Sequence, residues 1–176
     1  MKAEDCVLEN VTQHLDLWKH GDPVRPELGV KFKTAPGRVV YGLKLTAENK
    51  YVAFCCVSRT THVPKDVMEL SGFTSNSGEI LVPYTVWSLE KGAGRTIIKM
   101  LLDMVSKNNL ADRVVTLSPR TEMARRFHLR NGATEISTNV ASANFEYPVV
   151  RTQDIGDWYQ STATQDWDCA SHGEST

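Results

Sequence analysis

The segment SLEKGAGRTIIKMLLDMV, residues 88–105, places two glycines, an arginine and a threonine directly before an apolar helical pattern. The start of a helix leaves backbone N–H groups without partners and carries the positive end of the helix dipole. Gly92 and Gly94 would let a phosphate approach those N–H groups, while Arg95 and Thr96 would add a cation and a hydroxyl. The pattern indicates either a pyrophosphate-binding loop or a plain tight turn. The segment is not a P-loop, because the P-loop spacing is absent. It is not a G-x-G-x-x-G dinucleotide motif either, because the third glycine of that motif is absent.

A second group of chemically active side chains lies in one helical segment farther along the chain. Its members are Arg120, Arg125, Arg126, His128 and Arg130. A run of this kind is a solvated basic face, an anion contact or a nucleic-acid patch. Imidazole is also the side chain best suited to proton transfer near neutral pH. His128 is therefore a candidate acid or base, although a histidine beside an apolar face is more often a structural hydrogen-bonding group.

The elements that must position these residues follow from hydrophobic periodicity. The sequence predicts helices at residues 5–19, 63–73, 94–108 and 119–132. It predicts strands at residues 38–45, 51–60, 79–88, 112–118, 133–139 and 143–150. Pro83 lies inside one of these strands, where it cannot donate to a ladder, so we expect an edge, a bulge or a splayed pairing there. The alternation predicts an α/β or α+β sheet with helices on its faces.

Composition places limits on organisation and location. The chain has 176 residues, a net charge of −1 and no apolar run long enough for a membrane helix. Five acids follow Arg151 and no Lys or Arg does, which leaves a body of charge +4. We therefore expect one domain over residues 1–151 and a loosely ordered acidic tail over residues 152–176. The N-terminus lacks the pattern of an export signal, which favours a cytoplasmic protein.

The cysteines show no pattern typical of metal binding. They are Cys6, Cys55, Cys56 and Cys169. None forms a C-x-x-C or zinc-ligand spacing, and two of them lie inside an apolar run. We expect free thiols and no metal.

Together, the two clusters resemble the motifs of one protein family. LEKGAGRTIIKMLL is similar to the acyl-CoA-binding motif Q/R-x-x-G-x-G/A of the GNAT superfamily of N-acetyltransferases. TEMARRFHLRNGA resembles the second family motif, N-x-x-A-x-x-F/L-Y-x-x-x-G-F, with Ala124, Phe127 and Gly132 matching. The resemblance covers residues 38–149 and implies a mixed, mostly antiparallel central sheet flanked by helices. The chain also resembles small, divergent GNAT-like proteins from phage genomes.

The resemblance implies acetyl-CoA, or another acyl-CoA, as the ligand of the glycine loop. The residues implied in this contact are Val86, Trp87, Leu89, Lys91, Gly92, Ala93, Gly94, Arg95, Thr96 and Thr121. Leu89 stands where the family has Gln or Arg, so only its backbone could contribute. Thr121 replaces the motif's Asn, and either contacts the pantetheine arm or caps its helix. A splayed strand pair for pantetheine would account for Pro83.

The implied reaction is direct attack of an amine on the thioester in a ternary complex. His128 stands at the position of the family's tyrosine and would protonate the leaving thiolate. The candidates for the base are Tyr84, Glu79 and Glu146, and backbone N–H groups near Val86 and Trp87 would stabilise the oxyanion. The candidates for contacting the acceptor are Trp18, His20, Arg25, Asn139 and Asn144. The acceptor is an amine on a small molecule, a protein or a nucleic-acid base, and the protein is a monomer or a homodimer.

Two other readings stay open. The absent Gln/Arg and Tyr favour a GNAT-like binding module that recognises a protein or nucleic acid. Acyl transfer onto a nucleic-acid base would require salt-dependent nucleic-acid binding by a body of only +4.

Overall fold

The computed structural model describes residues 1–150, so the tail expected over residues 152–176 lies outside the described part of the chain. Eight strands form one sheet: β1 (Cys6–Asn10), β2 (Arg38–Leu45), β3 (Lys50–Thr60), β4 (Ile80–Ser88), β5 (Arg113–Val115), β6 (Ser118–Pro119), β7 (Thr134–Thr138) and β8 (Ser142–Tyr147). Four α-helices accompany it: α1 (Val30–Lys33), α2 (Val67–Phe73), α3 (Ala93–Asn108) and α4 (Glu122–Arg130). Among residues 1–150, no helix is long and apolar enough to cross a bilayer.

The strand order is β1-β2-β3-β4-β5-β8-β6, with β7 paired to β8. Every pairing is antiparallel except that of β4 with β5. The predicted fold class, a mixed and mostly antiparallel sheet flanked by helices, is therefore confirmed. The strands and helices expected from residue 38 onward are present with shifted ends, except that the single strand expected over residues 112–118 is interrupted and forms β5 and the start of β6.

The helix predicted over residues 5–19 is wrong. Its first half is β1, which pairs with β2, and its second half contains a 3₁₀ turn at Leu15–Leu17. Of the apolar residues at three-to-four spacing, Val11 and Trp18 are buried at 1 % exposure, whereas Val7 is 39 % exposed. Pairing with the open edge of β2 outweighed the helical periodicity, as tertiary context often does for a short segment.

Pro83 lies at a bulge, as expected. The β3–β4 register passes from Cys56 opposite Thr85 to Val57 opposite Pro83, which leaves Tyr84 as the extra residue on β4. On its other edge, β4 pairs with β5 only at Ile80 and Leu81. One further backbone bond joins the Leu117 N–H to the Pro83 carbonyl, at 3.0 Å. Beyond Pro83 the two strands part, so the splayed pairing is confirmed.

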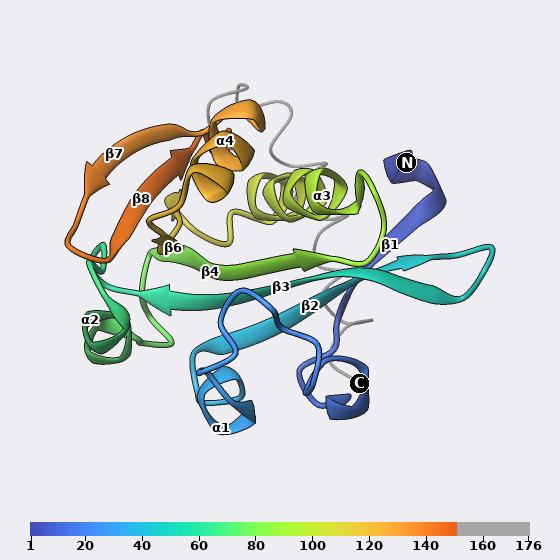
Figure 1. The fold of residues 1–176 in the computed structure, drawn as a ribbon, viewed down its shortest axis with the longest axis horizontal. Coiled ribbons are helices and arrows are strands. Elements are labelled where there is room, and N and C mark those ends of the chain that lie inside the picture. Colours follow the sequence, from blue (N-terminus) through green and yellow to red (C-terminus); the bar gives the residue numbers. More distant parts are fainter. Residues whose placement is uncertain (151–176) are drawn as a thin grey trace.

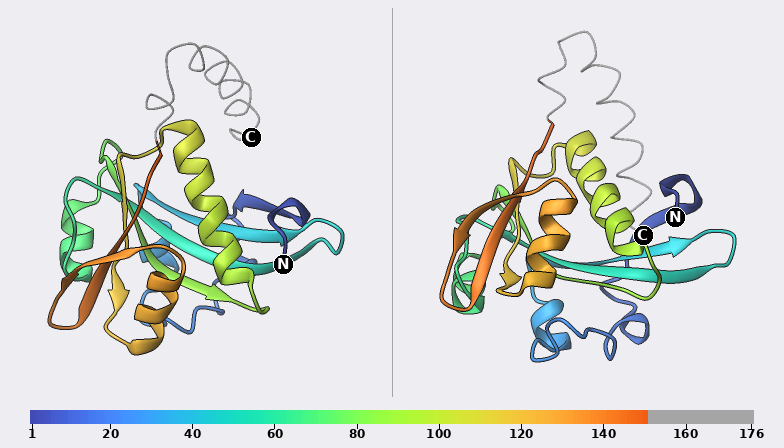
Figure 2. Two further views of the ribbon diagram at one scale, coloured as in Figure 1. Left: turned by 90° about the horizontal axis from the view of Figure 1, so that it is seen from above. Right: turned by 45° about the horizontal axis from the view of Figure 1, so that its top comes forward.

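Each face of the sheet carries its own core. Helices α3 and α4 cover one face, and α1, α2 and the segment before them cover the other (Figure 1). The apolar side of α3 packs mainly on β3 and β4, and its residues Ile97 and Leu101 share a buried cluster with Phe145 of β8. Trp18, Tyr84 and Leu117 belong to the core on the opposite face. Figure 2 shows α3 crossing the strands with α4 beside its N-terminal end. The parting of β4 from β5 therefore lies beside the junction of these two helices.

Candidate active site

The two glycines of the loop are required for different structural reasons. Gly92 is the N-cap residue of α3 and has φ +85°, a left-handed conformation that strongly favours glycine. Gly94 is helical, and a Cβ there would lie 3.2 Å from the Phe127 ring of α4. The first glycine thus makes the turn, and the second lets α3 approach α4 closely. The tight-turn explanation and the phosphate explanation are compatible, since both require this backbone.

The start of α3 is open to an anion. No side chain caps it. The first helical bond runs from Thr96 N–H to the Gly92 carbonyl, so the amides of Gly94 and Arg95 have no acceptor inside the helix. Lys91 and Arg95 are exposed, and Ala93 is buried. The Thr96 hydroxyl donates to the Gly92 carbonyl at 3.0 Å, so it contributes to the helix start rather than offering its proton to a ligand.

Leu89 is the weakest of the residues expected at this loop. Its side chain is 61 % exposed. Its backbone N–H donates to the Val52 carbonyl of β3 at 2.8 Å, so that N–H is not free to bind a pyrophosphate. The contribution expected from the Leu89 amide is therefore wrong, because the strand ladder already uses it.

A cavity of about 540 Å³ runs from this loop along the free edge of β4. One wall is β4 from Pro83 to Ser88, and the other is one side of α4, from its N-cap Thr121 to His128. Gly94 lies at one end, and Pro23 and Val24 close the other. Most of the lining is apolar, so the cavity suits a flexible chain with a few polar groups better than a highly charged ligand.

Backbone groups of β4 face this cavity at every second residue. Because the Leu89 N–H points toward β3, the amides of Val86 and Ser88 point to the opposite edge and that of Trp87 points toward β3. The Tyr84 carbonyl is directed to the cavity edge too, since a side chain from outside the β3 ladder bonds it. Of the two amides expected near an oxyanion, that of Val86 therefore has the suitable direction.

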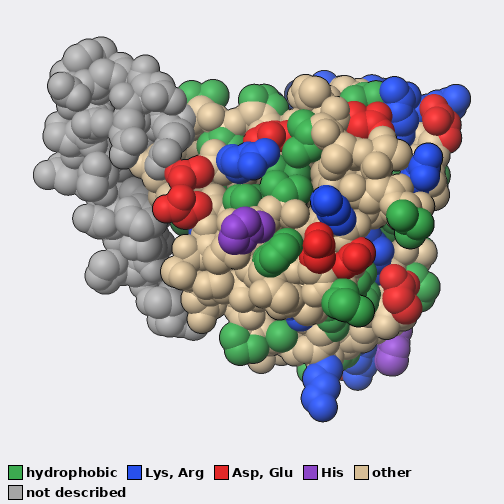
Figure 3. All heavy atoms as spheres, turned by 90° about the vertical axis from the view of Figure 1, so that its left-hand side faces the viewer, with side chains coloured by type: hydrophobic (Ala, Val, Ile, Leu, Met, Phe, Trp, Pro, Cys, Tyr) green, Lys and Arg blue, Asp and Glu red, His purple; other side chains and the backbone are tan. Residues whose placement is uncertain are grey.

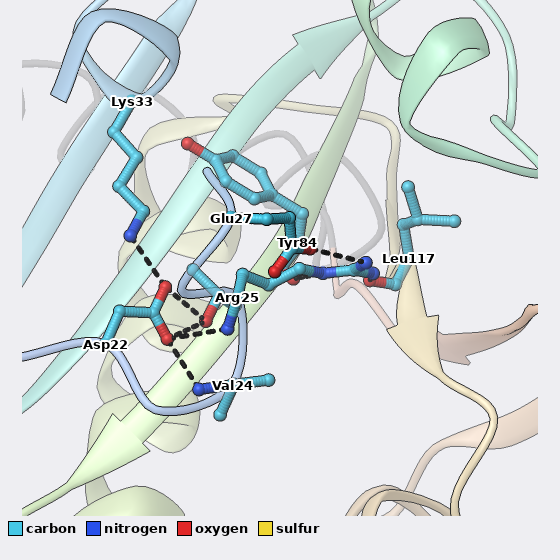
Figure 4. A network of polar contacts seen from close by, with 8 residues as sticks. Asp22, Val24, Arg25, Glu27, Lys33, Tyr84 and Leu117 are labelled. Atoms are coloured by element: carbon cyan, nitrogen blue, oxygen red, sulfur yellow. Dashed lines mark hydrogen bonds and ion pairs between the residues drawn. The ribbon is translucent and has the colours of Figure 1, made fainter. Parts of the chain in front are cut away.

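Arg25 lies where β4 separates from the segment between β5 and β6. Its Nε donates to the Tyr84 carbonyl at 3.1 Å, and its Nη2 donates to the Leu117 carbonyl at 2.9 Å (Figure 4). The nearest acid is Glu27, at 3.9 Å from Nη1. The guanidinium thus replaces backbone pairing across the gap and sets a cation at the narrow end of the splay. Burial lowers the pKa of Arg25, although a guanidinium stays charged at neutral pH.

A buried ion pair holds the segment that carries Arg25. Asp22 accepts from the Lys33 ammonium at 2.7 Å, and the two side chains are 3 % and 4 % exposed. The same carboxylate accepts from the backbone N–H groups of Val24 and Arg25 (Figure 4). It also accepts from the Thr85 hydroxyl. Asp22 therefore accepts hydrogen bonds from within its own loop, from Lys33 of α1 and, at both carboxylate oxygens, from the Thr85 hydroxyl of β4. Sequence reasoning missed it, and its only signal was an Asp-Pro turn.

His128 lies on the α4 wall and is 6 % exposed. Its Nε2 is 3.0 Å from the Ser118 hydroxyl, and its Nδ1 is 2.8 Å from the Tyr147 hydroxyl. Burial lowers the pKa of His128 to about 4. The ring is therefore neutral at pH 7, and the imidazolium acid expected from the sequence is disfavoured.

The comparisons with known proteins rest on structure. No family model and no curated protein matches the sequence. Among solved structures, the GphF GNAT-like decarboxylase in complex with isobutyryl-CoA matches with a TM-score of 0.61 at 15 % identity, over 80 % of this chain and 98 % of that one. The chain has the GNAT fold.

Other matches with the GNAT fold show the range of proteins that share it. AAC(6')-Ib in complex with paromomycin and acetyl-CoA has a TM-score of 0.56 at 10 % identity, over 86 % of this chain and 96 % of that one. A malonyl-CoA decarboxylase from Agrobacterium vitis has a TM-score of 0.52 at 17 % identity, over 72 % of this chain. The present chain spans only 36 % of that enzyme. At such identities the likeness establishes the fold alone.

Within the GNAT fold of this chain, none of the three candidate bases has the properties of a base. Tyr84 is 1 % exposed, and burial raises its pKa further above neutrality. Glu79 precedes β4 and lies about 17 Å along the strand from residue 84. Glu146 forms a two-bond ion pair with Arg113 at 2.8 Å, which lowers its pKa and occupies both oxygens.

Most of the residues expected to contact the acceptor are instead buried or hydrogen-bonded within the fold. The Trp18 indole is in the core and donates to the Val11 carbonyl at 2.9 Å. Asn144 is fully buried and joins the carbonyls of Pro64 and Thr116, so neither residue can line a site. Asn139 donates to Ser142 and Asn144 in the β7–β8 turn, outside the cavity lining. His20 is exposed, and Arg25 alone reaches the splay.

Of the two roles expected for Thr121, the structure shows the helix cap, and contact with a pantetheine arm stays a prediction. Its hydroxyl caps α4 by accepting from the Ala124 N–H at 3.2 Å, and the residue also lines the cavity. Among residues 1–150, no group of three or more His, Cys, Asp or Glu side chains could hold a metal ion.

Proposed function

We propose that this protein is an acyl-CoA-dependent N-acyltransferase that transfers an acyl group, in the first instance acetyl, to an amine. One observation carries the proposal. A single cavity joins the uncapped start of α3 to the free edge of β4 and ends where that strand parts from its neighbour. Acyl-CoA has matching parts in the same order: a pyrophosphate, an extended pantetheine arm with amide groups, and a thioester.

The chain's own groups fit each part of that ligand. The amides of Gly94 and Arg95, with the side chains of Lys91 and Arg95, would hold the pyrophosphate. The edge amides of Val86 and Ser88 would pair with the pantetheine arm as a neighbouring strand would. The Val86 amide would also stabilise negative charge on the thioester oxygen during attack. Holding the thioester beside the acceptor would supply most of the rate gain, because it replaces a collision by a fixed geometry.

Removing the two cations at the loop should weaken binding of CoA. We expect Lys91→Ala with Arg95→Ala to raise the Kd for acetyl-CoA roughly tenfold, since exposed ionic contacts contribute about 0.2–1 kcal/mol each and a tenfold change is about 1.4 kcal/mol. Calorimetry at two salt concentrations measures the effect, which should shrink at high salt. Lys107→Ala, at the other end of α3, is the matched control and should bind as the wild type does. An unchanged Kd in the double variant would contradict the placement of the pyrophosphate.

The binding-module reading has less support than the enzyme reading. Two arginines of the basic helix are already paired, Arg125 with Glu135 and Arg126 with Glu122. Arg120 bonds the carbonyls of Asn139 and Val140. On the described part of the face in Figure 3, basic and acidic side chains are intermixed rather than gathered in a stripe. A thermal-shift assay that finds no acyl-CoA binding at millimolar ligand would reject the enzyme and leave the binding module.

A second candidate is chemistry on an acyl-CoA whose acyl group carries a carboxylate. Arg25 is the observation that favours it, because its guanidinium lies at the narrow end of the splay, and its acidic neighbours are Glu27, at 3.9 Å, and Asp22, which is already paired with Lys33. Two proteins of similar fold are named as decarboxylases. A cation in this position would attract a carboxylate and could hold it for transfer or removal.

Comparing two ligands on one variant tests this candidate. We expect Arg25→Met to weaken binding of malonyl-CoA about tenfold more than binding of acetyl-CoA, because only malonyl-CoA loses a charged contact. Any structural damage caused by the substitution affects both ligands and cancels in the ratio. Equal losses for the two ligands would assign Arg25 a purely structural role.

The identity of the acceptor, the cytoplasmic location, the phage relationship and the choice between monomer and homodimer stay predictions. Transfer onto a nucleic-acid base likewise stays an alternative, to be tested by salt-dependent binding of nucleic acid.

A further inference from the structure

A chain of four buried polar groups ends at the wall of the cavity. The Ser118 hydroxyl donates to the Thr116 hydroxyl at 2.8 Å, and that oxygen also accepts from the Phe145 N–H at 3.1 Å. Ser118 contacts His128 Nε2 at 3.0 Å, and His128 Nδ1 contacts the Tyr147 hydroxyl at 2.8 Å. Of these four hydrogen-bonded residues, only Ser118 and His128 line the cavity. The other members lie behind them.

The direction of these hydrogen bonds follows from the number of protons. The Ser118 proton points to Thr116, so the contact with His128 requires an N–H on Nε2. Nδ1 then carries no proton and accepts from Tyr147. In this arrangement the Nε2 proton of His128 is directed at Ser118 and not at the cavity. A neutral ring of this kind orients the serine and has no proton to give to a sulfur atom.

Ser118 lies next to the point where the strands part. It follows Leu117, whose carbonyl is joined through Arg25 to the Tyr84 carbonyl on the opposite wall. Val115 and Leu117 belong to the core on the face away from α3 and α4. Side chains alternate along an extended chain, so those of Thr116 and Ser118 face the α4 side. The Ser118 hydroxyl is thereby placed at the acyl end of the cavity, where the thioester is proposed to lie.

We propose that Ser118 is the catalytic residue that returns the proton to the CoA sulfur, and that His128 is a positioning residue that orients its hydroxyl. This inference rests on the proposed acyl transfer. When the amine nitrogen has added to the thioester carbon, its excess proton passes to Ser118 Oγ. The Ser118 O–H, which donates to Thr116 in this structure, turns to the sulfur when CoA is bound, while His128 Nε2–H keeps donating to the serine oxygen. Its proton then passes to the sulfur as the C–S bond breaks. The products are the amide, the CoA thiol and an unchanged serine, with no net change of charge and no ionised histidine.

The first test separates catalysis from binding. Ser118→Ala should lower kcat about 100-fold, in the range for loss of one proton-transferring group, while the Kd for acetyl-CoA changes less than twofold. Ser106→Ala, a serine of α3 outside the cavity, is the matched control and should leave both constants unchanged. His128→Gln keeps an N–H donor and should retain most of kcat. Its kcat should not change between pH 6 and pH 8. A kcat for Ser118→Ala equal to that of the wild type would overturn the proposal.

The second test needs no acceptor. A hydroxyl that donates to the sulfur stabilises the thiolate, so the thiol pKa of bound CoA should be lower in the wild type than in Ser118→Ala by about one unit. The ultraviolet absorbance of the thiolate, titrated with CoA bound, measures it. If Ser118→Ala is unfolded, Ser118→Cys keeps the volume and should show the same rise, since S–H is a weak donor. Equal thiol pKa values overturn the role of Ser118 but leave the proposed transfer standing. Failure of the wild type to bind CoA would instead remove both.

Discussion

Replacing Asp22 by alanine is expected to lower the free energy of unfolding by about 3–5 kcal/mol, the cost of removing one partner of a buried ion pair. The Lys33 side chain is 4 % exposed, and its ammonium is paired with Asp22 at 2.7 Å. Without that carboxylate the cation stays desolvated and unpaired. The N–H groups of Val24 and Arg25 and the Thr85 hydroxyl lose their acceptor as well. Because a domain of this size has a total stability of about 5–15 kcal/mol, much of it would be lost.

A double variant shows whether the charge is responsible. Asp22→Ala with Lys33→Met should recover the part of the loss that comes from the unpaired Lys33 charge, because an apolar side chain can replace a buried charge at little cost. The part that comes from the unsatisfied donors of Val24, Arg25 and Thr85 should remain. Urea unfolding of the wild type, both single variants and the double variant gives the coupling between the two residues. A loss below about 1 kcal/mol in Asp22→Ala would show that water or a rearranged loop compensates for the missing carboxylate. In the folded fraction, acetyl-CoA binding should also weaken, since Asp22 holds Val24 at the cavity end.

The sheet from residue 38 onward could be predicted because each strand carries its own signal. β2 and β3 are runs of β-branched and aromatic residues separated by a polar turn, and they pair with each other. The bulge at Pro83 could be predicted too, since proline has no N–H for a ladder. β1 could not, because Val7, Leu8 and Val11 match a helix as well as a strand. The edge of β2, which decides between the two, is distant in sequence.

The site was predictable where it depends on local chain geometry. The spacing of Gly92 and Gly94 before a helix is visible in the sequence, as is His128 in the following helix. Burial and long-range hydrogen bonding are not visible in the sequence. Polar residues that were equally good candidates for the site therefore proved to have different roles. Asn144 is a buried structural link, whereas Arg25 reaches the splay through bonds to residues 59 and 92 positions away. Ser118 carried no signal beyond its place directly after a strand.

His128 should make the stability of the fold depend on pH in a narrow window. Its pKa is about 4 in the folded protein and about 6.5 when unfolded, so the unfolded chain binds the proton more readily. The stability that the neutral ring contributes is complete above pH 6.5 and is lost as the pH falls toward 4. The total is about 3 kcal/mol, from 1.36 kcal/mol for each unit of pKa difference.

Urea unfolding at pH 7.5 and pH 4.5 measures this loss, and His128→Gln isolates it. The carboxylates with lowered pKa, such as Glu9 and Glu146, are deprotonated in both states through most of this interval and contribute mainly below it. The wild type should therefore lose about 2–3 kcal/mol more than His128→Gln between the two pH values. Equal losses would mean that the ring reaches water or gains a proton in place at little cost. The neutral ring that orients Ser118 would then be excluded by the same measurement, because both arguments require His128 to resist protonation inside α4.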